Sequence, residues 1–260
     1  MGIFNKLYIC ILVIASAVIL FFTADSFSIT SSIVPERIAV NSLYHGSRIV
    51  ISGETEADRD IILKISSPEV QTNFHKKGKA GGVLWMNIGG LEFNPVPYVY
   101  LIYTTKDINS MLSESQRDVY VIGYDAFRRH VNVSPAANDA EKENWLGEFI
   151  KFKEKEKVYG VFPGTVEIKN SGDKTAYNLF LDWPYEAPPM EYTISVYAVK
   201  DGAITDSTEK SLVVEKTGLL KFLSDMAFNH EIIYGIISII IAVVAGFIVS
   251  LLFKGKSGVH

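Results

Sequence analysis

The chain has 260 residues, a formal net charge of −4 at pH 7 and one cysteine. Between two apolar ends lie roughly two hundred residues, which is enough for one large domain or two small ones. The acidic balance excludes a basic nucleic-acid-binding protein, and the cysteine count excludes a disulfide-stabilised exported domain.

Residues 1–28 predict a secretory signal. Lys6 precedes sixteen uncharged, mostly apolar residues, and small and polar residues follow them. Cleavage after Ser26 or after Ser28 fits this pattern, although neither site is a clean Ala-x-Ala, and an uncleaved N-terminal anchor remains the alternative. Cys10 lies inside the apolar run and has no small residue before it, so the pattern does not indicate a lipoprotein signal.

Residues 29–106 predict a first β-rich module. Short runs rich in Val, Ile and Tyr are separated by turn residues, which is typical of an antiparallel sandwich. The predicted strands are 37–44, 48–54, 60–66, 70–75, 82–88 and 98–105. We expect turns at Gly78 to Gly81 and at Asn94-Pro95-Val96-Pro97.

Residues 107–158 lack strand alternation and predict a helical connector. The run Asn138-Asp139-Ala140-Glu141 is a capping box at the start of a helix. The apolar residues of this helix fall on one face: they are Trp145, Leu146, Phe149, Ile150 and Phe152. We expect this stripe to pack on a β-layer, with a partner-binding helix as the alternative.

Residues 159–216 predict a second antiparallel module. Its strands are expected at 164–170, 176–183, 190–200 and 203–216. Asp201-Gly202 predicts a two-residue hairpin turn that requires positive φ. The predicted fold is therefore mainly β, with two antiparallel immunoglobulin-like sandwich modules, a helical connector and a C-terminal transmembrane helix.

The C-terminal residues predict attachment to a membrane. Residues 217–231 form an amphipathic juxtamembrane segment, and residues 232–253 are more than twenty residues without a charge, long enough to cross a bilayer. Residues 254–260 form a short tail. The N-terminal signal places this tail in the cytoplasm and the main domain on the exported side of the membrane, as a single-pass protein.

Motifs for chemistry are absent from the sequence. Its exported histidines have no second ligand at metal-binding spacing, and no Gly-x-Ser-x-Gly presents a nucleophile. We expect no cofactor, no metal and no enzymatic activity.

The segment HKKGKAGG, residues 75–82, has lysines among glycines, as a phosphate-binding loop does. It lacks the Ser or Thr after Gly-Lys, and a strand follows where a nucleotide site needs a helix. Exported compartments also contain little ATP or GTP. We therefore expect a hairpin tip, either merely solvated or contacting an anionic partner, a lipid headgroup or a small anion through its lysines.

Several segments together resemble an uncharacterised "putative transmembrane protein" family known chiefly from alphaproteobacteria. The most specific are the strand with Gly82, Trp85 and Asn87, the Pro188-Pro189 segment, and the junction running from residue 218 to residue 235. The family usually has a small residue where this chain has Met190. The resemblance implies a periplasmic protein with a single anchor in a bacterial inner membrane, without transferable catalytic residues and similar to an accessory subunit of a transporter.

We expect a membrane-anchored, non-enzymatic protein that acts by protein contact, as an accessory subunit of a transporter or redox membrane complex. Its partners would be the lipid bilayer, through residues 232–253, and another membrane protein, without nucleic acid. Candidate contact residues are Lys76, Lys77, Lys79, Leu220, Phe222, Leu223, Ala242, Ala245 and Gly246.

The alternative hypothesis is a solute- or ion-binding sensor with its ligand between the two modules. Aromatic residues could line such a site, although core packing is their commoner role. The candidates are Trp85, Tyr98, Tyr100 and Trp183. A periplasmic enzyme is a third alternative.

Overall fold

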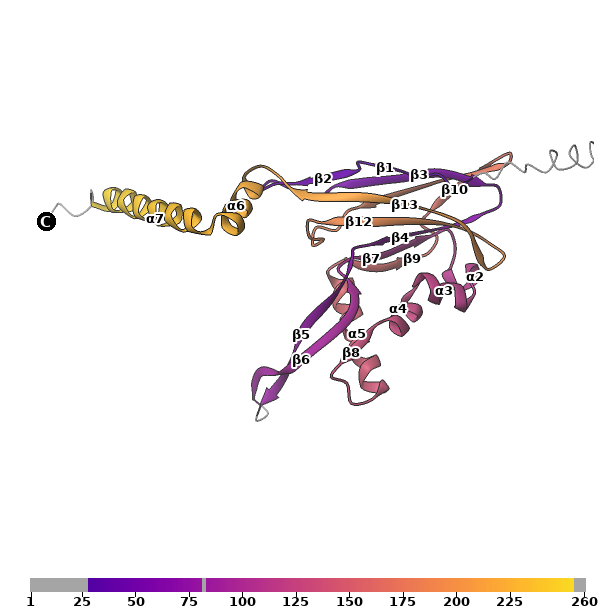
Figure 1. The fold of residues 1–260 in the computed structure, drawn as a ribbon, viewed down its shortest axis with the longest axis horizontal. Helices are drawn as coiled ribbons and strands as arrows, with labels where there is room; N and C mark the ends of the chain where they lie inside the picture. The colour runs from indigo at the N-terminus through magenta and orange to yellow at the C-terminus, as the bar shows by residue number, and fades with distance from the viewer. Residues whose placement is uncertain (1–27, 81–82, 255–260) are drawn as a thin grey trace, which may run out of the picture.

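The computed structural model describes residues 28–80 and 83–254. The protein is mainly β, as the sequence predicts, with three sheets and a group of helices (Figure 1). All of the predicted signal except Ser28 lies outside the described residues.

Two large sheets form the body of the protein. Sheet A has the strand order β1 (Ser32–Val34), β3 (Arg48–Glu56), β11 (Lys174–Asp182), β10 (Glu167–Ser171). Sheet B has the order β2 (Arg37–Val40), β13 (Ala203–Lys216), β12 (Glu191–Lys200), β4 (Asp60–Ser66), β7 (Tyr100–Thr104), β9 (Tyr159–Phe162). Buried residues of both sheets belong to one hydrophobic cluster, so the sheets pack as two layers of one core.

The predicted division into two sandwich modules is wrong. Strand β3 comes from the first predicted module and pairs along its length with β11 from the second. Strand β4 pairs in the same way with β12. Local periodicity identifies a strand but not its partner, and here the partners lie more than a hundred residues apart.

Sheet B is the middle layer of the protein. In β4, Ile61, Leu63 and Ile65 face one way, and Ile62 and Lys64 face the other, because side chains alternate along a strand. The first set packs toward sheet A, whereas Lys64 Nζ donates to the carbonyl oxygen of Tyr120 in the helical layer, at 2.7 Å. Burial lowers the pKa of Lys64. Strand β4 is therefore covered on both faces.

The helical layer covers the second face of sheet B (Figure 1). It consists of α2 (Ile108–Met111), α3 (Glu114–Tyr120), α4 (Tyr124–His130) and α5 (Asp139–Lys155). The predicted cap of α5 is confirmed, since the Asn138 side chain accepts from the Glu141 N–H at 2.9 Å. Of its apolar stripe, Leu146, Phe149 and Ile150 are buried, whereas Phe152 is 45% exposed.

A long hairpin projects from this body. Strands β5 (Glu69–Ala80) and β6 (Leu84–Pro97) pair with each other, and β8 (Asn132–Ser134) pairs with β6 to complete sheet C. The turn predicted at residues 94–97 is wrong, because these residues belong to β6. The hairpin expected around HKKGKAGG is confirmed, but its turn begins later than predicted, because Gly78 to Ala80 belong to β5. The positive φ of Asp201 and Gly202 between β12 and β13 is also confirmed.

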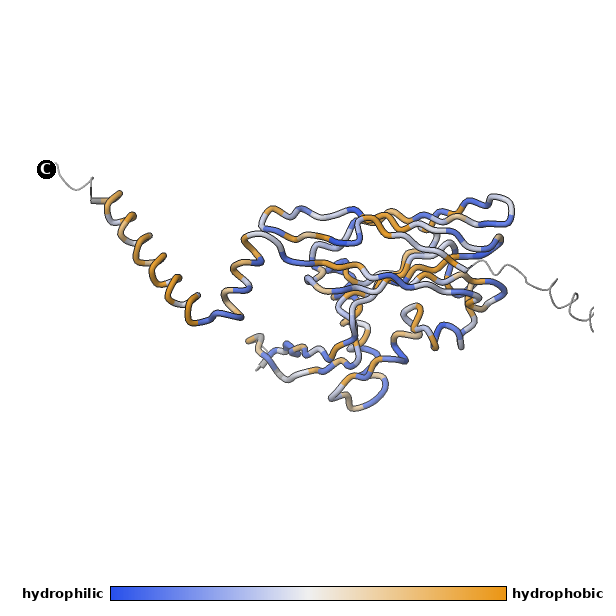
Figure 2. The backbone as a smooth tube through the Cα atoms, turned by 45° about the horizontal axis from the view of Figure 1, so that its top comes forward, coloured by the Kyte–Doolittle hydropathy of each residue, from blue (hydrophilic) through white to orange (hydrophobic). Residues whose placement is uncertain are grey.

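Two helices end the part of the chain that the structure describes. Helix α6 (Gly218–Asn229) follows β13, and α7 (Glu231–Lys254) is a long apolar helix, which is orange along most of its length in Figure 2. The most apolar 18-residue window within Glu231–Phe253 has a mean hydropathy of 3.0, and none of it is buried. At ~1.5 Å per residue the helix is about 36 Å long, which suffices to cross a bilayer.

Candidate binding groove

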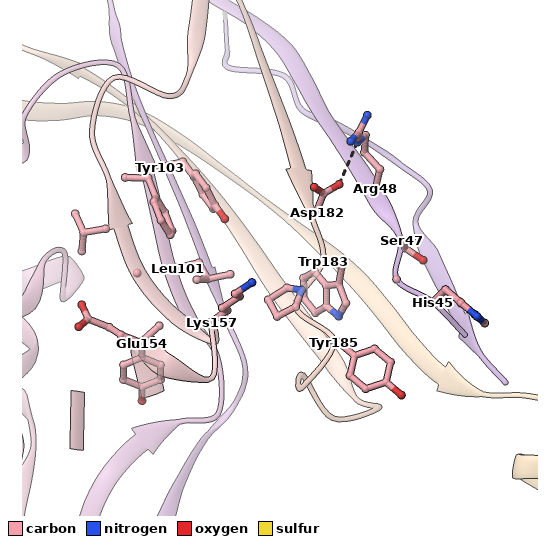
Figure 3. Close-up of a pocket in the computed structure, with 16 residues that line it drawn as sticks. His45, Ser47, Arg48, Leu101, Tyr103, Glu154, Lys157, Asp182, Trp183 and Tyr185 are labelled. Atoms are coloured by element: carbon pink, nitrogen blue, oxygen red, sulfur yellow. Dashed lines mark hydrogen bonds and ion pairs between the residues drawn. The ribbon is translucent and has the colours of Figure 1, made fainter. Parts of the chain in front are cut away.

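An open groove of about 990 Å³ lies between the two large sheets, at the edge of sheet B formed by β9 (Figure 3). We call it the interlayer groove and define it by six of its lining residues: Arg48, Leu101, Tyr103, Phe162, Trp183 and Tyr185. Leu101 and Tyr103 come from β7 and Phe162 from β9, whereas Arg48 begins β3 and Trp183 follows β11.

The groove exists because the edge strand of sheet A is short. Strand β10 pairs with β11 only as far as Asn178, opposite Glu167. The remaining residues of β11, up to Asp182, pair with β3 on one side and extend past the end of β10 on the other. No strand of sheet A therefore covers the neighbouring face of β7 and β9 there.

Aromatic rings form much of the groove wall. Tyr103 and Phe162 stack with their ring centroids 4.8 Å apart, and Tyr185 stacks on Tyr44 at 6.1 Å. Trp183 is buried and meets Tyr192 edge-on at 4.7 Å. Its indole N–H has no hydrogen-bond partner among the described residues. Such rings give a flat, apolar surface with few rotamers to fix, which suits the binding of another chain or molecule.

Charges of both signs border the rings. Arg48 Nε donates to Asp182 Oδ1 at 3.1 Å, and this pair is drawn as a dashed line in Figure 3. Lys157, Glu154 and His45 lie around the same opening. Burial, and then the charge of Asp182, raise the pKa of Tyr103 to about 12, so its hydroxyl stays protonated at neutral pH.

Strand β9 presents an open edge beside the groove. The Tyr100 N–H donates to the Val158 carbonyl at 2.9 Å, and β7 pairs with β9 in parallel. Since backbone groups of successive residues point to opposite sides of a strand, those of Tyr159 and Val161 point away from β7. Within the described residues β9 has no second partner strand. Strand β9 is therefore an edge of sheet B within the described residues.

Gly160 lets the ring of Phe162 lie over β9. A Cβ atom at Gly160 would overlap two ring carbons of Phe162, so any side chain there would displace this ring. The glycine thus maintains the stacked wall made with Tyr103.

Lys157 reaches the groove from a strained backbone position. It follows the last turn of α5 with φ of 59°, where helices usually place glycine, and its N–H donates to the Glu154 carbonyl at 2.9 Å. A non-glycine residue in this conformation costs about 1–2 kcal/mol. The chain therefore has a lysine at the groove in a backbone conformation that glycine would adopt with less strain.

The lysines of HKKGKAGG differ from one another. Lys76 Nζ lies 3.3 Å from Glu141 Oε1 and 4.8 Å from the centroid of the Trp145 ring, so it joins the hairpin to α5. Lys77 and Lys79 are exposed beyond this contact. None of the three lysines borders the interlayer groove.

The predicted contact residues of α6 and α7 lie near the membrane end of the chain. Phe222 and Leu223 are 58% and 45% exposed, whereas Leu220 is half-buried beside Tyr44 and Tyr185. Three small residues of α7 share one face of the helix, and all are exposed: Ala242, Ala245 and Gly246.

Of the predicted aromatic residues whose side chains the structure describes, only Trp183 lines the groove. Tyr100 is fully buried and donates to the Val121 carbonyl at 2.9 Å, whereas Tyr98 is 38% exposed outside the groove. The side chain of Trp85 is not among those that the structure describes. Three further groove residues are not predicted from the sequence: Tyr103, Phe162 and Lys157. Of these, only Lys157 has a local signal, because it follows a helix at a position that favours glycine.

No group of three or more His, Cys, Asp and Glu side chains that could hold a metal occurs in residues 28–80 and 83–254. The groove contains one histidine, His45, and its other charged groups are distributed between opposite walls. The arrangement can bind by stacking, by backbone pairing and by ion pairs.

The family to which the chain is matched agrees with the long apolar helix α7. No curated protein matches the chain. The sequence model of a family described as "Putative transmembrane protein" matches residues 28–255, which include the β-sheets, the groove and α7. The chain therefore belongs to this transmembrane protein family.

Proposed function

We propose that the chain is a non-enzymatic accessory subunit that binds an extended segment of another membrane protein in the interlayer groove. Helix α7 anchors it in a bacterial inner membrane, with the β-domain in the periplasm and the tail in the cytoplasm. The apolar length of α7 and the signal-like N-terminus support this placement.

The open edge of β9 beside the aromatic wall is the observation that carries the proposal. An added strand would pair with the outward backbone groups of Tyr159 and Val161 and lay side chains on Tyr103 and Phe162. Backbone pairing provides affinity and the neighbouring side-chain sites provide specificity, as in other cases of strand addition. The ion pairs at the rim would fix the direction of the segment.

Photocrosslinking in intact membranes tests the proposal. Benzoylphenylalanine would replace Tyr185, which is 69% exposed at the groove, and Phe180, which is 56% exposed and projects from β11 on the face away from the sheet interior. We expect an adduct with a second protein from Tyr185 and none from the matched Phe180 position. Adducts with this chain alone, or equal adducts from both positions, would contradict the proposal.

A second variant tests strand pairing itself. Val161→Pro removes an N–H that points to the open edge while leaving the β7 ladder intact, because proline is tolerated where the N–H faces outward. We expect an unchanged unfolding temperature and loss of the Tyr185 adduct. Retention of the adduct would show that the partner is held without backbone pairing.

The groove volume favours solute binding as a second candidate function. About 990 Å³ falls within the upper range of small-molecule sites. If the chain is a solute sensor, the purified full chain should bind a small molecule from a periplasmic extract. Native mass spectrometry would detect the complex. Such binding should be lost in Gly160→Leu, where the displaced Phe162 ring fills the groove.

A further inference from the structure

The end of the β5–β6 hairpin is apolar on one face and cationic on the other. Cross-strand partners share a face, so the pairs Gly78–Met86 and Ala80–Leu84 place Leu84 and Met86 together. Lys77 and Lys79 occupy the opposite face. Leu84 is 71% exposed and Met86 52% exposed, and neighbouring Val83 is 81% exposed. We call Val83, Leu84, Met86, Lys77 and Lys79 the hairpin tip.

The tip extends beyond the part of the hairpin that is held in place. Phe93 stacks on Phe149 of α5 with centroids 4.6 Å apart, and Phe74 meets the same ring edge-on at 5.5 Å. The ion pair of Lys76 with Glu141 is the next contact along the hairpin. These contacts fix the direction of the hairpin, and the hairpin tip lies beyond them.

The hairpin and the C-terminal helices share one end of the molecule. In Figures 1 and 2 the hairpin extends from the sheets toward the end at which α6 and α7 lie. Helix α6 also exposes large apolar side chains, among them Leu219, Phe222 and Phe228 at 61%, 58% and 77%. A bilayer crossed by α7 would therefore meet two exposed apolar elements of the domain.

We propose that the hairpin tip is a second membrane contact, which inserts Val83, Leu84 and Met86 into the interface of the same bilayer and places Lys77 and Lys79 among anionic headgroups. An exposed apolar cluster with adjoining lysines is the composition of an interfacial membrane site, because the apolar groups enter the acyl boundary while the amines remain at the headgroups. The overall negative charge of the chain does not itself favour an anionic surface, which makes these local cations the relevant feature. The proposal rests on the span by α7 but does not require the groove.

Depth-dependent quenching in proteoliposomes tests this contact. The full chain, with Cys10→Ser, would carry a bimane label on one introduced cysteine: Leu84→Cys at the tip, Ile240→Cys within α7, or Ile168→Cys on β10 as the matched exposed control. The vesicles would contain phosphatidylcholine and phosphatidylglycerol at about 7:3, with spin-labelled lipids as quenchers. We expect quenching at Leu84 and Ile240 and none at Ile168.

The two parts of the proposal fail differently. Quenching at Ile240 without quenching at Leu84 would agree with α7 spanning the bilayer but would overturn the tip contact. Absence of quenching at both positions would overturn the spanning of the bilayer by α7. Lys77→Glu with Lys79→Glu should weaken the Leu84 signal, and each lysine near an anionic surface should contribute about fivefold to the contact equilibrium. The matched change Lys169→Glu on β10 should have no effect.

A protein partner at the tip is the competing outcome. It would protect the Leu84 label in native membranes but not in vesicles of lipid alone, and that result would overturn the proposal. Equal quenching in pure phosphatidylcholine, unchanged by the two lysine reversals, would contradict the role of anionic headgroups.

Discussion

Leu63 and Leu84 both lie in strands, yet their surroundings are opposite. Leu63 is 0% exposed in β4, the strand covered by sheet A on one face and by helices on the other. Leu84 is 71% exposed at the end of the β5–β6 hairpin, beyond the contacts with α5. The buried apolar residues of β4 stabilise the fold. The exposed apolar residues of the hairpin tip add little to its stability and can contact another surface.

The largest predicted effect is the difference between these two leucines. Leu63→Ala leaves a cavity in a fully covered layer and should lower the free energy of unfolding by about 2–5 kcal/mol. Leu84→Ala removes no buried contact and should change it by less than about 0.5 kcal/mol. Chemical denaturation of the full chain in detergent, followed by tryptophan fluorescence, measures both. A comparable loss from Leu84→Ala would mean that the tip packs against the body.

The next prediction concerns the contact between the hairpin and α5 that lies next to the exposed tip. Glu141 accepts hydrogen bonds from the Ala137 N–H, from Trp145 Nε1 and from Lys76 Nζ, and these lower its pKa to about 2. Because the folded-state pKa is depressed, the stabilisation is present above the ordinary value of 4.5 and is lost as the pH falls toward 2. We expect hydrogen-exchange protection of the hairpin to decline over that pH range.

Substitution should reproduce this change at neutral pH. Glu141→Gln keeps the size of the side chain but removes its charge, and should increase exchange of the hairpin amides several-fold. Glu143→Gln is the matched control, since Glu143 lies on the same helix and pairs with Arg128 instead, at 3.1 Å. If both variants behave alike, the effect belongs to the helix and not to its contact with Lys76.

The sequence predicted what depends on neighbouring residues. The helix cap at Asn138, the positive-φ turn at Asp201 and the long apolar helix α7 each follow from a few adjacent residues, and all three are present. The pairing of β3 with β11 depends on residues far apart in the chain, and no local pattern specifies it. The division into two modules was wrong for that reason.

The interlayer groove was hidden from sequence for the same reason. It exists because β10 ends opposite Asn178 while β11 continues, and this is a property of strand pairing. Trp183 was identified as an aromatic candidate, but its neighbours Tyr103 and Phe162 look like ordinary strand residues. Lys76 and Lys77 are adjacent lysines in the sequence, and only the fold places Glu141 of α5 beside Lys76.

The smallest predicted effect is a gain in stability that weakens binding. Lys157 adopts φ of 59° and Asp58 adopts φ of 56°, but only Lys157 borders the groove. Replacing either residue by glycine relieves about 1–2 kcal/mol of strain, partly offset by about 0.5–1 kcal/mol of additional unfolded-state entropy. The free energy of unfolding of each variant should therefore rise by about 0.5–1 kcal/mol.

The two glycine variants should then differ in function. Lys157→Gly removes a cation from the rim and should lower the yield of the Tyr185 photoadduct several-fold, whereas Asp58→Gly should leave that yield unchanged. Lys157→Arg, which keeps both the charge and the strain, should retain the adduct without the gain in stability. A lysine kept at a position that favours glycine is expected where its charge contacts a partner, and unchanged adduct from Lys157→Gly would remove that explanation.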